Sequence, residues 1–306
     1  MHARRRMAAT IATLGLIGAI ALPAADTAVG ADVEPPLAPI EITRTPLGRD
    51  LARRIAARHL AAGMPVKASD MTVWEVGQNG FFVGRQVPDE LRVSVVRARG
   101  VPTRMRVSFA VGAGGEETAS RTGWTATGSA AASVTTPSWA FLDAGCFARL
   151  GGGGLGFLDA CYSLHRLVNE SNAKDFYKLE QYGTLSAGIA AKIYSGWMSA
   201  VRASGSSTMQ WVDWSPRGNV KGGCQNLTLK VEALGVSFVS PAYFCENNIP
   251  TKYEAAGSFR LEWSCGCIYP FGQPYPNSRE IDYLQTVSVA NGGSVRWTLS
   301  AGYLAR

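Results

Sequence analysis

The sequence predicts a mainly β protein: an antiparallel, disulfide-linked β-sandwich preceded by a small α+β unit. Apolar and polar residues alternate in segments such as 227–233, 259–265 and 294–299, which is typical of antiparallel strands with one solvent-exposed face. Turns rich in glycine, proline and asparagine separate these segments, as in sandwiches and barrels. The six cysteines are an even number, which in an exported chain indicates disulfides.

Residues 1–31 are expected to be a signal peptide. Three arginines at positions 4–6 precede the apolar run Met7–Leu22, and small residues follow where cleavage is expected. Because a membrane-spanning helix needs about 20 apolar residues, a cleaved signal is favoured over a retained anchor. The mature chain is therefore expected to begin near Ala31, to lack a transmembrane segment, and to be secreted or extracellular, with the cell wall as one location.

The rest of the chain divides by composition into three parts. Residues 32–46 carry four prolines and no periodicity, so they are expected to be a linker. Residues 47–112 are expected to form a small basic α+β unit, and residues 113–306 the β-sandwich domain. The boundary falls in a run of glycines and charged residues at 112–120.

Local patterns predict individual elements within these parts. The apolar stripe of 47–64 predicts a helix. An Asn-Gly pair in 71–84 predicts a turn between two short strands. Segment 189–201 fits both a helical and a strand repeat. We expect a strand, because Gly196 would weaken a helix by about 1 kcal/mol.

The positive charge is concentrated in residues 40–110, whose balance is +6. Such a surface attracts anionic wall polymers or lipid headgroups, although a solvated basic face without a partner is the simpler interpretation. Nucleic acid is not expected as a partner, because an exported protein seldom meets it. A propeptide that assists or blocks the β domain is an alternative interpretation of this segment.

The glycine run at 151–156 formally matches G-x-G-x-x-G, the pattern of a dinucleotide-binding turn. A phosphate site would need a helix after the glycines, but residues 157–167 alternate like a strand. Cys146 and Cys161 bracket the run, and a disulfide between them would stabilise the loop by roughly 3 kcal/mol. We therefore expect a disulfide-closed hairpin and no nucleotide cofactor.

The remaining cysteines leave the disulfide connectivity open. Cys224 and Cys245 flank two predicted strands and could form a bridge at the open end of that hairpin. Cys265 and Cys267 could pair across one residue in a strained, redox-active bridge, or each could bond to Cys224 or Cys245. No metal is expected, because an all-thiolate zinc site is disfavoured in an oxidising compartment.

Catalytic candidates are few. There is no G-x-S-x-G elbow and no H-E-x-x-H motif. A glycan hydrolase would need two carboxylates, for which Asp213 and Glu262 are candidates because each lies beside tryptophan. Trp211 is expected to share a face with Asp213. His165 is a third candidate, although a structural histidine is the simpler interpretation.

Aromatic residues are the best candidates for binding. The proline-rich loop 267–278 is aromatic, and exposed rings of this kind bind sugars, peptides or lipid interfaces. The expected ligand-binding residues are Tyr269, Phe271, Tyr275, Trp211 and Trp214. We therefore expect a non-catalytic binding or structural role at the envelope or outside a bacterial cell, with a wall glycan, an anionic wall polymer or another secreted protein as partner. A secreted glycan hydrolase and a membrane-active protein are the alternatives.

Overall fold

The structure is a computed structural model that describes residues 42–44, 49–61, 66–77, 80–98, 101–114, 138–149, 155–168, 173–188, 193–216, 224–231, 236–245, 248–252, 257–264 and 278–305. These residues belong to one compact unit, Leu37–Arg306. Several predictions concern residues outside the described ones: the signal peptide, the glycines at 151–154, Cys265, Cys267, Tyr269, Phe271 and Tyr275.

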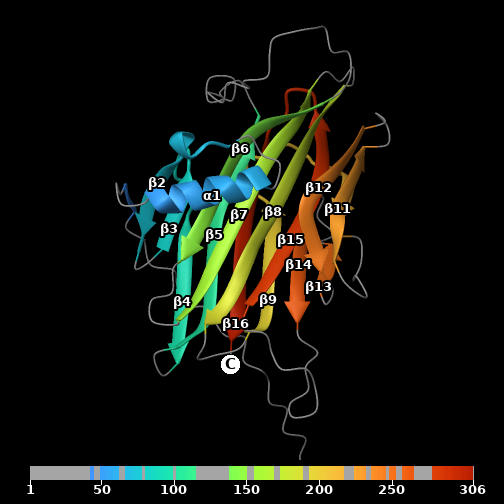
Figure 1. Ribbon diagram of the computed structural model, residues 1–306. Coiled ribbons are helices and arrows are strands. Elements are labelled where there is room, and N and C mark those ends of the chain that lie inside the picture. The colour runs from blue at the N-terminus through green and yellow to red at the C-terminus, as the bar shows by residue number, and fades with distance from the viewer. Residues whose placement is uncertain are drawn as a thin grey trace, which may run out of the picture. The chain divides into compact units, whose positions relative to one another are not determined.

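Two antiparallel sheets form the body of the described chain, which confirms the predicted fold class (Figure 1). Sheet A has eight strands in the order β1 (Ile42–Arg44), β2 (Thr72–Val76), β3 (Gly80–Gly84), β6 (Ser138–Arg149), β7 (Leu155–Val168), β8 (Lys174–Gly188), β15 (Ser278–Ala290) and β10 (Gln210–Ser215). Sheet B has six in the order β13 (Asn248–Lys252), β14 (Phe259–Ser264), β9 (Ile193–Arg202), β16 (Val295–Ala305), β5 (Val101–Ala113) and β4 (Arg92–Ala98). A separate hairpin consists of β11 (Cys224–Val231) and β12 (Val236–Cys245).

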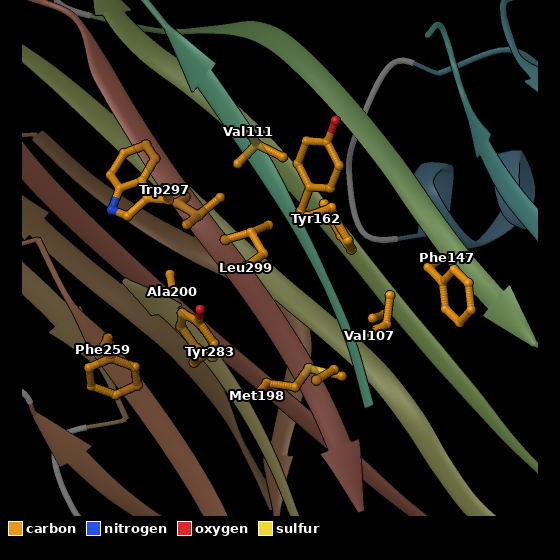
Figure 2. Close-up of a cluster of buried hydrophobic side chains, with 14 of the residues drawn as sticks. Val107, Val111, Phe147, Tyr162, Met198, Ala200, Phe259, Tyr283, Trp297 and Leu299 are labelled. Carbon is orange, nitrogen blue, oxygen red and sulfur yellow. The ribbon is translucent and has the colours of Figure 1, made fainter. Parts of the chain in front are cut away.

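One hydrophobic core joins the inner faces of the two sheets. The alternation in the sequence produces it: Met105 and Phe109 of β5 and Trp297 and Leu299 of β16 are fully buried. Figure 2 shows side chains from both sheets meeting there: Phe147, Tyr162 and Tyr283 from sheet A, and Val107, Val111, Met198, Ala200, Phe259, Trp297 and Leu299 from sheet B. Removing these side chains from water is the main favourable contribution to folding.

The predicted helix is α1 (Arg49–Ala61), and it covers part of the outer face of sheet A, the face turned away from sheet B (Figure 1). Ala52 and Ile55 pack in a second, smaller core with Cys146 and Cys161. The predicted disulfide joins these two cysteines, whose Cα atoms are 4.0 Å apart. Helix and disulfide therefore stabilise the same part of sheet A. A short 3₁₀ helix, η1 (Ala68–Asp70), follows α1 in the chain.

The strands between residues 47 and 112 join both sheets. β3 pairs with β6 in sheet A, and β5 pairs with β16 in sheet B. The strands of this segment belong to the two sheets of the sandwich, and its assignment as a separate α+β unit stays a prediction. Residues 42–44, within the predicted linker, form β1 and pair with β2.

Three further predictions about hairpins and strands can be compared with the structure. The chain after the glycine run is the strand β7, as predicted, and Cys146 lies opposite Cys161 in the β6–β7 pair. The described part of 189–201 is the strand β9, also as predicted. In the β11–β12 hairpin, Cys224 lies opposite Cys245, and a bridge between them stays a prediction.

Candidate functional site

A row of polar side chains crosses the outer face of sheet A, beyond the part covered by α1. Directly paired residues of antiparallel strands share a face. The register places His165 of β7 opposite Lys178 of β8, Lys178 opposite Thr286 of β15, and Thr286 opposite Asp213 of β10. All four side chains are buried, and we call these four residues the polar row. Two residues singled out in the sequence, His165 and Asp213, therefore lie in the same row.

Two more buried polar residues lie one step along β7 and β8. Ser163 pairs with Glu180, and both are fully buried. The Ser163 hydroxyl donates a long hydrogen bond of 3.5 Å to Glu180 Oε2. The same hydroxyl lies 3.2 Å from His165 Nε2. Ser163 thus connects the imidazole to the carboxylate.

Burial sets the electrostatics of this cluster. It lowers the pKa of the His165 imidazole well below its usual value, and the positive charge of Lys178 lowers this pKa further. Burial also lowers the pKa of Lys178 to about 7, while the Glu180 carboxylate acts in the opposite direction. The Lys178 ammonium lies 5.8 Å from the ring centroid of Trp139, and Phe141 meets the His165 ring edge-to-face at 5.4 Å. The His165 imidazole is therefore uncharged at neutral pH, whereas the Lys178 amine changes charge near pH 7.

The arrangement does not match a nucleophile–base–acid relay. In such a relay the acid orients the histidine, which in turn activates the hydroxyl. Here the Glu180 carboxylate accepts a hydrogen bond from Ser163, and Ser163 and His165 are neighbours on one face of one strand. Ser163, His165 and Glu180 therefore do not have the order of contacts that such a relay needs.

The structure does not bring the two candidate carboxylates together. Asp213 lies on the outer face of sheet A, whereas Glu262 lies on the outer face of sheet B, where it forms an ion pair with Arg260. Packed sheets are about 10 Å apart, so these carboxyl groups are further apart than the roughly 5–9.5 Å that glycosidases use. Asp213 and Glu262 therefore do not form a hydrolytic pair.

A β-bulge on β10 changes the expected placement of Trp211. Trp211 pairs with the inward-facing Val287, but Asp213 pairs with Thr286, so the register shifts between them. The prediction that Trp211 and Asp213 share a face is therefore wrong. The backbone N–H of Trp214 donates a 2.9 Å hydrogen bond to Asp213 Oδ1.

Trp211 and Trp214 lie half-buried against the core between the sheets. Their rings meet edge-to-face with centroids 5.5 Å apart, and Trp211 also meets Phe259 of sheet B at 6.5 Å. These contacts give both tryptophans a packing role at the β10 edge of the sandwich. Their assignment as ligand-binding residues stays a prediction.

Sequence reasoning missed Ser163, Lys178 and Glu180. The signal was present, because Lys178 and Glu180 alternate with Tyr177 and Leu179 along β8. Alternation alone assigns charged residues to a solvent-exposed face. Only the register of β7, β8 and β15, which brings them beside His165, identifies them as a buried cluster.

Two further findings concern the part of the chain that the structure describes. No helix there has the length and apolar character needed to cross a membrane. In the same part of the chain, no group of three or more histidine, cysteine or acidic side chains is placed to hold a metal ion.

Comparisons with known proteins do not assign a family. Neither a family model nor a curated protein matches the sequence. Among solved structures, the membrane-inserted form of the Clostridium perfringens NetB toxin is similar at 7% identity with a TM-score of 0.31, over 54% of this chain and 83% of that one. Clostridium perfringens delta-toxin is similar at 7% identity with a TM-score of 0.33, over 72% of this chain and 90% of the toxin chain. A protein described as a pore-forming protein is similar at 7% identity with a TM-score of 0.28, over 65% of this chain and 78% of that one. TM-scores of this size do not establish a shared fold, so these similarities assign no function to this chain.

Proposed function

We propose that the protein is exported and acts outside the cytoplasm by binding a component of the cell envelope, without catalysing its turnover. The Cys146–Cys161 disulfide carries the proposal, because structural disulfides form and persist in oxidising compartments. Its full burial beneath α1 makes it part of the folded core. The apolar run at residues 7–22, preceded by arginines, supports the same location.

The placement of the acidic candidates favours binding over hydrolysis. Asp213 and Glu262 belong to different sheets, and His165 is buried with its hydroxyl neighbour on the same strand. A retained basic segment fits this role as well, because β3 and β5 are paired inside the two sheets. Removing residues 40–110 as a propeptide would leave β6 and β16 without these neighbours, so we expect the secreted chain to begin near residue 31.

The test uses protein recovered from culture medium without added reductant. Alkylation followed by mass spectrometry should find Cys146 and Cys161 unmodified and the first residue near 31. Free thiols at these positions would contradict export into an oxidising compartment, and a first residue near 115 would support the propeptide alternative.

A second assay separates binding from catalysis. The protein should co-sediment with isolated cell walls, release no reducing ends from them, and leave anionic lipid vesicles intact. Release of reducing ends that Asp213→Asn abolishes would favour the hydrolase instead. Leakage of vesicle contents at low salt would favour the membrane-active alternative.

A further inference from the structure

The hairpin of β11 and β12 is separate from the two large sheets. It is a two-stranded sheet of its own, and no ladder of hydrogen bonds joins it to another described strand. β11 lies against β10 and β15, and β12 lies against β15. An isolated pair of strands is only marginally stable in water. The hairpin therefore depends on packing, or on a covalent link, to keep its two strands paired.

The register of this hairpin places two cysteines directly opposite each other. Cys224 is the first residue of β11 and Cys245 is the last residue of β12, so they pair at the open end of the hairpin. The next two pairs follow in step, and the register shifts only after Asn226. Directly paired residues of antiparallel strands have Cα atoms about 4.5 or 5.5 Å apart. Both separations lie within the roughly 4.4–6.8 Å that a disulfide spans.

The same relationship already carries a disulfide elsewhere in this chain. Cys146 of β6 and Cys161 of β7 are direct partners in an antiparallel pair, and their sulfur atoms are bonded. Cys224 and Cys245 repeat this placement on β11 and β12. A cross-strand disulfide therefore needs no change in the register of the hairpin.

Cys265 and Cys267 are the competing partners for Cys245. Asn248, which follows Cys245 closely in the sequence, pairs with Trp263, which closely precedes Cys265. The β13–β14 pairing thus brings the chain after Cys245 near the chain before Cys265. However, the ladder of the described residues pairs Cys245 directly with Cys224. The described register therefore favours Cys224 as the partner.

We propose that Cys224 and Cys245 form a second cross-strand disulfide, which closes the open end of the β11–β12 hairpin. This covalent site goes beyond the proposed envelope binding and does not rest on it. The oxidant is a disulfide compound, and the bond forms by thiol–disulfide exchange. Two cysteine thiols become one Sγ–Sγ bond, and the two electrons that they lose reduce the oxidant.

The exchange takes place in two steps that balance. One cysteine loses its proton, and its thiolate attacks the oxidant, which gives a mixed disulfide and releases the first oxidant thiolate. The second cysteine loses its proton in turn, and its thiolate attacks the cysteine sulfur of the mixed disulfide. This attack forms the Sγ–Sγ bond and releases the second oxidant thiolate. The two released thiolates take up the two protons, so the oxidant leaves as two thiols.

The test uses the full mature chain, treated with reductant and then reoxidised with glutathione disulfide, so that its result is independent of export. Remaining thiols are alkylated in denaturant at mildly acidic pH, where exchange is slow, and the protein is digested with trypsin without reduction. Trypsin separates the cysteines into peptides 222–230, 231–252 and 261–279. Mass spectrometry should find 222–230 linked to 231–252, and reductant should release the two peptides.

Serine variants assign the two partners. Cys224→Ser should abolish the linked peptide and leave a newly alkylated thiol at Cys245, and Cys245→Ser should do the converse. The matched control Cys265→Ser/Cys267→Ser removes two other cysteines and should keep the link between 222–230 and 231–252. Thermal unfolding of each variant shows whether the fold is retained.

Limited digestion of the native protein measures what the bond does for the hairpin. Cleavage after Lys230 requires β11 to open locally. The variant Cys224→Ser/Cys245→Ser should be cleaved there at least about fivefold faster than wild type, because the two strands are no longer linked. A rate equal to that of wild type would overturn the stabilising role of the bond.

The outcomes separate this inference from the proposed function. Alkylation of both Cys224 and Cys245 in the reoxidised wild type would overturn the disulfide. A link from peptide 261–279 to 222–230 or to 231–252 would overturn the pairing. Either result leaves the envelope binding untouched, because co-sedimentation with cell walls tests that function separately. If the serine variants do not fold, the peptide map of the wild type decides alone.

Discussion

The indole Nε1 of Trp297 donates a 2.7 Å hydrogen bond to the backbone carbonyl of Gly257 inside the core. Trp297 is fully buried on β16, and Gly257 has φ +78°, a conformation that favours glycine. The side chain of one strand thus fixes the turn that leads into β14, which packs on the other side of β9. This contact connects the centre of sheet B to a turn near its edge.

Replacing Trp297 by Phe should therefore destabilise the protein beyond the loss of volume. The substitution removes a donor and leaves the Gly257 carbonyl buried and unpaired, so we expect the free energy of unfolding to fall by about 2–4 kcal/mol. Urea unfolding followed by circular dichroism measures this change. Trp74→Phe, at a half-buried position against the same core, should cost less than half as much. Equal costs would show that the Gly257 hydrogen bond contributes little.

The disulfide should stabilise the fold mainly by restricting the unfolded chain. Its two cysteines are 15 positions apart, and closing such a loop contributes about 3 kcal/mol in the chain-entropy model. The double variant Cys146→Ala/Cys161→Ala should lose about this free energy of unfolding. Wild-type protein unfolded in urea with a reductant should show a similar loss. A double variant as stable as the oxidised wild type would contradict the expectation.

An ion pair with a buried carboxylate should contribute more to stability than a fully exposed pair of the same kind. Asp175 is buried and accepts hydrogen bonds from Arg166 at 2.7 Å and from the Gly292 backbone N–H at 2.8 Å. Asp175→Asn removes the charge of this buried carboxylate from its hydrogen bonds to Arg166, whose side chain is 42% exposed, and to Gly292, and should cost about 1.5–3 kcal/mol. Asp50→Asn removes the Asp50–Arg53 pair, whose side chains are 86% and 69% exposed, and should cost less than about 0.5 kcal/mol. Chemical denaturation of the two variants gives the comparison, and similar costs would contradict it.

Stability should fall as the pH is lowered, because two buried bases resist protonation in the folded state. The pKa of His165 is below its unfolded value of about 6.5, so below that pH the unfolded chain binds a proton that the folded chain does not. The pKa of Lys178 is lowered to about 7, so stability rises between about pH 7 and pH 10.4 for the same reason. Burial raises the pKa of Asp143 on the inner face, which has the opposite sign and acts at more acidic pH.

Variants at the two bases separate these contributions. His165→Gln should lose less stability between pH 7 and pH 5 than wild type, by on the order of 1 kcal/mol. The pair Lys178→Met/Glu180→Gln should remove most of the rise between pH 7 and pH 9. Urea unfolding at pH 5, 7 and 9 measures these differences, and identical pH profiles for His165→Gln and wild type would contradict the assignment.

The sequence was informative where structure is local. The fifteen-residue spacing of Cys146 and Cys161 predicted their disulfide, and the alternation in β5 and β16 predicted which residues are buried. The helix α1 followed from its apolar stripe. Each of these features depends on residues that are close in the sequence, within one or two neighbouring helices or strands. Residue periodicity carries information over that short range.

Features that depend on distant strands could not be predicted in this way. The bulge after Trp211 turns Asp213 to the opposite face, and nothing in the segment's composition marks it. Lys178 and Glu180 follow the pattern of exposed residues, yet both are fully buried. The joining of His165 and Asp213 into one row requires the register of strands far apart in the chain.

The pairing of β16 with β5 has a consequence for how the chain reaches this state. β16 lies inside sheet B, between β9 and β5, and its residues come roughly 190 positions after those of β5 with which they pair. Closing so long a loop must precede the favourable contacts, which slows folding. Until residues 295–305 are in place, β5 and β9 both present open strand edges. Nascent chains should therefore be prone to aggregate and to depend on chaperones until this late strand arrives.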